Sequence, residues 1–188
     1  MTYDIKNVFY LDTNFDVVAG QAAASERGRT LDISAYIDPV AKGRAKGVGL
    51  AIYKVHFDWS VTEGNAPVGP TEAGAGRAAL LVGDYGYSNT TTDVVQEQLT
   101  LCAANQNLVA GQDFFGPVYA GTAGMYENEI LSPSIQVPYI AVRDTLNLVW
   151  GQGLTAGTLD NNISVRLECA QISLGTDVLN QLLRTQTV

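Results

Sequence analysis

His56 is the only histidine in this chain of 188 residues, so it is the first candidate for catalysis or metal binding. It lies in the stretch AIYKVHFDWSV (51–61), between Lys54 and Asp58 at alternate positions. A metal site of the usual kind needs several histidine or cysteine ligands, and no second histidine or cysteine pair stands nearby. We therefore expect a solvent-facing or interface histidine, with no metal and no cofactor.

Carboxylates are the second source of chemistry, because a pair of Asp or Glu residues can hydrolyse glycosides. The spacing selects no pair among the candidates, which are Asp58, Glu63, Asp84, Glu97, Asp144 and Glu168. Asp144 stands out because it interrupts an apolar segment. Pairing with Arg166 or with groups beside Arg143 explains it better than catalysis does.

Motifs of common enzymes are missing from the sequence. It contains no Gly-x-Ser-x-Gly elbow, Walker loop, CxxC or HExxH pattern. GAGRAAL at Gly74 and GQGLTAG at Gly151 lack the full spacing of phosphate-binding loops and are typical of hairpin turns. The sequence predicts a protein that is not an enzyme.

Composition indicates one folded domain with an acidic surface. A chain of 20.0 kDa can bury a full core without disulfides, so Cys102 and Cys169 are predicted to be reduced core thiols. The formal net charge is −8, which disfavours contact with phosphate backbones. A local group of basic residues is interpreted as solvated surface: Arg27, Arg29, Lys42, Arg44 and Lys46. We expect no direct sequence-specific binding of nucleic acid.

No targeting segment is predicted. The start MTYDIKNVFYLD lacks the basic region and apolar run of a secretory signal. Uncharged stretches are broken by glycine and polar residues before they reach the length of a transmembrane helix.

Alternating apolar residues predict β-strands. In 51–61, one face carries Ala51, Tyr53, Val55, Phe57, Trp59 and Val61. Similar alternation occurs in 29–37 and 162–169, and a phase shift after Ala170 indicates a bulge. Further strands are expected at 5–11, 78–82, 94–103, 134–137 and 139–150, although 93–102 also fits a helix. The clearest helix signal begins at 175, where an acid in the first turn precedes a leucine stripe.

Two long connections separate these strands. The first, 62–77, is small and polar and is predicted to be a mobile excursion. The second, 111–133, contains large apolar residues that a free loop would not expose: Phe114, Phe115, Tyr119, Met125 and Tyr126. It is predicted to pack on the domain or on a neighbouring molecule.

These elements predict an all-β fold, namely an antiparallel two-sheet sandwich. A single jelly roll with about eight strands, long loops and a short C-terminal helix is the most economical arrangement, and an immunoglobulin-type sandwich is the alternative. The single domain spans 1–188, with an N-terminal arm and connector at 1–28, the sandwich at 29–174 and the helix at 175–188.

The layout resembles the single jelly-roll major capsid proteins of icosahedral viruses. The resemblance rests on chain length, the extended arm, the opening strand KGVGLAIYKVHFDWSV, a loop-rich middle, and the closing strands YIAVRDTLNLVWGQG and NNISVRLECAQISLG. It implies a virion protein, assembled in the host cytoplasm, whose arm and loops join copies of the chain. A second capsid protein is a further expected partner. The expected interface residues are apolar: Ile5, Val8, Phe9, Tyr10, Leu11, Phe114, Phe115 and Tyr126.

The arm departs from capsid proteins that hold the genome with a basic arm. It has only Lys6 against Asp4, Asp12 and Asp16, which implies indirect genome contact. Two other functions stay open. A phage tail or tube subunit would also be all-β, and a carbohydrate-binding module would display exposed aromatics, for which Tyr85 and Tyr87 are the candidate pair.

Overall fold

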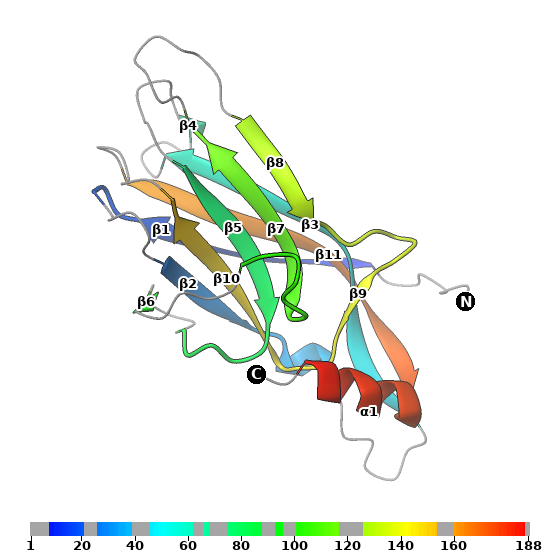
Figure 1. Ribbon diagram of the computed structural model, residues 1–188. Coiled ribbons are helices and arrows are strands. Elements are labelled where there is room, and N and C mark those ends of the chain that lie inside the picture. Colours follow the sequence, from blue (N-terminus) through cyan, green and yellow to red (C-terminus); the bar gives the residue numbers. More distant parts are fainter. Residues whose placement is uncertain are drawn as a thin grey trace.

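The computed structural model describes residues 8–20, 26–38, 46–61, 66–67, 75–87, 93–95, 101–116, 126–153 and 160–186. Strands dominate these ranges, with one short helix at the C-terminal end (Figure 1). The strands are β1 (Phe9–Val17), β2 (Glu26–Asp32), β3 (Lys46–Val61), β4 (Ala66–Pro67), β5 (Ala75–Val82), β6 (Asp93–Val95), β7 (Leu108–Phe115), β8 (Tyr126–Leu131), β9 (Tyr139–Ala141), β10 (Thr145–Gln152) and β11 (Asn161–Gly175). The helices are the 3-10 turn η1 (Ser34–Tyr36) and α1 (Thr176–Thr185).

The strands form two antiparallel sheets. Sheet A has the order β1-β11-β3-β4, with β9 also paired to β3, and sheet B has the order β6-β2-β10-β5-β7-β8. The first long strand pairs with the last, and β2 pairs with β10, so the chain is wound as nested pairs shared between the two sheets. This strand order is that of a jelly roll, and the predicted fold class is confirmed.

The main core lies between the two sheets and is anchored by three aromatic rings. Trp59 of β3, Phe114 of β7 and Trp150 of β10 have ring centroids 5.5–6.1 Å apart. All three side chains are buried, which confirms the predicted interior position of Trp59. Gly76 of β5 leaves room for this cluster, because a Cβ atom there would collide with the indole of Trp150.

A bulge in β3 divides its apolar pattern into two faces. Ile52 pairs with Cys169 and Lys54 pairs with Glu168, so Tyr53 is the extra residue on β3. The core therefore receives Leu50 and Ile52 before the bulge, and Val55 and Trp59 after it. The prediction that Ala51 and Tyr53 share the face of Trp59 was wrong, since both lie in a separate small cluster with Ala170.

Several strand boundaries differ from the sequence prediction. The sandwich already begins at Phe9, because β1 pairs with β11 along its whole length, so part of the predicted arm belongs to sheet A. Residues 139–150 form two strands in different sheets, β9 and β10, rather than one. The predicted connection 111–133 contains most of β7 and all of β8, which pair with each other.

The predicted C-terminal helix is confirmed as α1. Its buried Leu179 packs with Val142 and Leu174. Beyond it, the buried Gln186 side chain accepts a hydrogen bond from the Val142 amide (3.1 Å) and donates one to the Ile140 carbonyl (2.6 Å). No helix in the described ranges has the length and apolarity needed to cross a membrane.

Candidate functional site

His56 lies on the outer face of sheet A, as the sequence predicted. Its side chain is 44% exposed, and its Nε2 lies 2.9 Å from Glu168 Oε1 on the neighbouring strand β11. Both residues line an open hollow of about 550 Å³ together with Tyr10, Asp12, Asp58 and Arg166. Among the described residues, no group of three or more His, Cys, Asp or Glu side chains is placed to hold a metal ion.

The candidate carboxylates are distributed over different surfaces. Asp58 and Glu168 share the hollow beside His56, where the Glu168 carboxylate is already engaged by the imidazole. Asp84 and Asp144 line a second hollow of about 420 Å³. Asp144 is exposed in the turn between β9 and β10 rather than on a strand face, and its backbone carbonyl accepts a hydrogen bond from the Ile33 amide. Glu63 and Glu97 lie outside the described residues.

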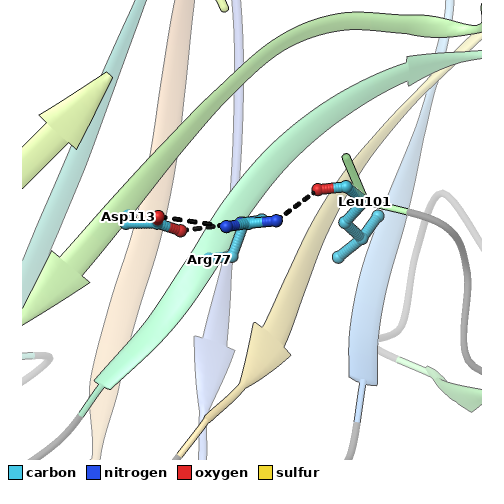
Figure 2. Close-up of polar contacts among 3 residues, drawn as sticks. All are labelled: Arg77, Leu101 and Asp113. Atoms are coloured by element: carbon cyan, nitrogen blue, oxygen red, sulfur yellow. Dashed lines mark hydrogen bonds and ion pairs between the residues drawn. The ribbon is translucent and has the colours of Figure 1, made fainter. Parts of the chain in front are cut away.

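An arginine–aspartate pair on sheet B anchors a loop. Arg77 of β5 donates from Nε and Nη2 to both carboxylate oxygens of Asp113 on β7, at 2.6 and 3.0 Å (Figure 2). Its Nη1 donates to the Leu101 carbonyl at 2.7 Å. The hydrogen bonds that Arg77 donates to Asp113 raise the pKa of its guanidinium above the ordinary value. All three donor nitrogens are used within the chain, so this arginine has a structural role.

The predicted N-terminal interface residues divide between the two faces of β1. Tyr10 is 62% exposed and Val8 is also exposed, whereas Phe9 and Leu11 are partly buried against the main core. Phe9 stacks on Tyr36 with ring centroids 4.9 Å apart. The strand alternation therefore leaves Val8 and Tyr10 on the surface. Ile5 lies outside the described residues.

The aromatic residues of the second predicted connection also separate. The structure places Phe114 inside the molecule, where its ring packs against both tryptophans and presents no surface to another molecule. Its neighbour Phe115 points outward and is exposed. Tyr126 begins β8 opposite Phe115, but its side chain lies outside the described part of the structure, as do Tyr119 and Met125.

An apolar surface at the end of β8 and in the segment after it was not predicted from the sequence. Leu131, Ile135 and Val137 are exposed, the last two by 65% and 75% of their surfaces. Residues 134–137 were predicted as a short strand, but they form no strand in the structure. Pro133 and Pro138 flank them, and this signal could have identified an irregular surface segment, because proline interrupts strand pairing.

The aromatic pair considered for carbohydrate binding does not form an exposed platform. Tyr87 is buried on the outer side of sheet B, where its ring covers Gly28 and packs with Leu81 and Val149. This burial raises the pKa of its hydroxyl well above the ordinary value. Tyr85 is partly buried beside the same cluster and accepts a hydrogen bond from the Asn107 amide.

The chain is similar in structure to viral VP1 proteins. Two such structures are VP1 of trichodysplasia spinulosa-associated polyomavirus, one in complex with GM1 oligosaccharide and one with sialylated precision glycooligomers. The first is 8% identical with a TM-score of 0.42, and the match covers 93% of this chain and 96% of that chain. The second is 7% identical with a TM-score of 0.42, covering 93% and 97%. No protein-family model matches the chain, and the search of curated proteins gives no match.

Proposed function

We propose that this protein is the subunit of a viral capsid shell, which assembles through contacts between copies of itself. The observation that carries the proposal is a set of large apolar side chains left exposed on a sandwich whose core is otherwise complete. They lie at or beside the outer strands β1 and β8: Val8, Tyr10, Phe115, Leu131, Ile135 and Val137. Exposed apolar groups at two separate edges favour a protein that contacts more than one neighbour.

The sheet edges support the same proposal. β1 is the outermost strand of sheet A, and β8 is the outermost strand of sheet B. Unpaired backbone groups along such edges can accept a strand from another chain. On β1, one of them is already occupied, because Arg29 Nη1 donates to the Asn14 carbonyl at 2.6 Å. The rest of the edge is where we place an arm from an adjacent copy.

The acidic charge bears on the other partners in this proposal. With a net charge of −8, the subunit repels nucleic acid at long range, so the genome is held indirectly, and a second capsid protein is the further partner. The protein is then a virion component assembled in the host cytoplasm. We assign it no catalytic role.

The β8 edge offers a test in solution. Phe115→Asp and Leu131→Asp each place a charge on an exposed apolar position and should leave the melting temperature unchanged while reducing the fraction of protein in large particles. Lys46→Asp, an exposed change at the end of β3, is the control. Sedimentation velocity measures the particle fraction. Normal particles from both variants, at the end of β7 and at the end of β8, would remove this edge from the assembly contacts.

A tail or tube subunit is one alternative, because it would use similar edges in a ring. Particle shape distinguishes the two functions, since closed shells and open rings differ in electron micrographs.

A further inference from the structure

The outer face of sheet A carries a continuous shallow trough. One hollow of about 550 Å³ lies over β1, β11 and β3, and another of about 460 Å³ lies between β3 and residues 132–136. Glu168 lines both hollows, so they adjoin across the sheet. The trough therefore runs from Tyr10 at one side of sheet A to Ile135 at the other.

One row of side chains crosses this trough at right angles to the strands. Strand register places Tyr10 beside Glu168 and Glu168 beside Lys54. Ile135 continues the row, because it lines the 460 Å³ hollow together with Lys54 and Glu168. Across the sheet, the row reads aromatic, acid, base and aliphatic.

Most charges on this face lack a partner within the chain. Glu168 uses one carboxylate oxygen for His56. In the described part of the chain, the side chains of Lys54, Arg166, Asp12 and Asp58 form no hydrogen bond or ion pair. Glu129, which lines the hollow beside residues 132–136, adds a third carboxylate. Two cations and three carboxylates are therefore left to interact with another molecule, and a partner that carries charge of one sign would be repelled by at least two of them.

We propose that this face docks a second copy of the chain about a two-fold axis that runs parallel to the strands between β11 and β3. Such an axis reverses the order of the row while keeping its height along the strands. Tyr10 of each copy then faces Ile135 of the other, and Glu168 faces Lys54 of the other. The row is complementary to its own reverse, which is the requirement for a two-fold interface. The proposal deepens the proposed function by assigning one of the contacts between copies.

The size of the face indicates a weak dimer. The nine residues of β1 span roughly 30 Å, and four strand spacings span roughly 19 Å, which gives about 600 Å² per copy. A standard stable interface buries about 800 Å² per partner, so we expect dissociation in the micromolar range and additional support from other contacts in a particle.

Charge reversal provides a test with an internal rescue. Lys54→Glu gives the row two acidic side chains, and Glu168→Lys gives it two basic ones. In a dimer of either variant, like charges then face each other. Each variant alone should therefore dimerise at least tenfold more weakly than the wild type at low salt. Mixing the two variants restores both opposite-charge contacts, and the double variant K54E/E168K restores them within one chain. Both should return to within about threefold of the wild-type dissociation constant. Lys46→Glu, at the far end of the same strand, is the matched control and should have no effect.

Sedimentation velocity on the full chain separates monomer, dimer and larger particles in one experiment, and circular dichroism confirms that each variant is folded. Dimer loss in the single variants with recovery in the mixture supports the inference, even if no particles form and the capsid function fails. A wild type that shows no dimer up to about 0.5 mM overturns it. Normal dimers from both single variants also overturn it, while particles in the same samples would leave the capsid function standing.

Discussion

Replacement of Trp59 by alanine tests whether the aromatic cluster holds the two sheets together. Trp59 belongs to sheet A, while both of its aromatic neighbours, Phe114 and Trp150, belong to sheet B. Its surface is only 4% exposed. A buried tryptophan removes roughly 200 Å² from water, which at about 25 cal/mol per Å² corresponds to about 5 kcal/mol as an upper estimate. Large-to-small changes in cores agree, with costs of about 3–5 kcal/mol.

Urea unfolding is a suitable assay, because Trp150 remains as a fluorescent probe inside the same cluster. With a slope of about 2 kcal/mol per molar urea, a loss of 4 kcal/mol lowers the midpoint by about 2 M. Tyr10→Ala is the control, since its side chain lies on the surface, and it should change stability by less than about 0.5 kcal/mol. If Trp59→Ala is soluble and its urea midpoint falls by less than about 0.5 M, the Trp59 ring does not hold the two sheets together.

The other predictions concern single positions. His56→Gln should keep the free energy of unfolding within about 0.5 kcal/mol of the wild type, because its ion pair is solvent-exposed; loss of bound zinc together with function would contradict this. Gly76→Ala should cost about 1–3 kcal/mol in urea unfolding, because the new methyl group meets the buried indole of Trp150, and an unchanged midpoint would show that the ring can move. Burial raises the pKa of the Cys169 thiol from 9.0 to about 12, so the unfolded state releases this proton first and stability should fall as pH rises from about 9 to 12. Cys169→Val should make that fall shallower by up to about 1.4 kcal/mol per pH unit, and an identical pH profile would contradict the assignment.

Strands with strict alternation were predictable from the sequence. In β11, the residues Ile163, Val165 and Leu167 face the core, because one side of the strand is buried against sheet B along this length. The helix α1 was predictable because its leucines recur at helical spacing after an acidic first turn. Each of these signals depends only on neighbours along the chain.

The features that were not predicted depend on contacts distant in sequence. The apolar phase shift near Ala170 indicated an irregularity in β11, but the extra residue is Tyr53 of β3. Its position shows only in the pairing of β3 with β11, where it changes which face is buried. The turn at 142–144 contains neither glycine nor proline, so nothing local separated β9 from β10. The start of β7 was not predicted as a strand, because residues 108–111 combine a Gly with apolar side chains that are all buried.

The candidate contact surface on sheet A was predictable only in part. Tyr10 was expected at an interface from the apolar character of the N-terminal segment, and strand alternation places it outward. Ile135 was not expected there, since its exposure follows from the way residues 132–138 connect the edge of sheet B to sheet A. The row that joins Tyr10 to Ile135 comes from four separate segments. Strand register brings Tyr10, Glu168 and Lys54 together, and the fold of residues 132–136 beside β3 adds Ile135.

Negative-stain electron microscopy of the purified full-length protein tests the central claim most directly. A capsid subunit that assembles through its own surfaces should form closed particles of uniform size as the protein concentration rises. Dispersed single copies at high concentration, in a preparation that also contains any second capsid protein, would contradict the proposed function.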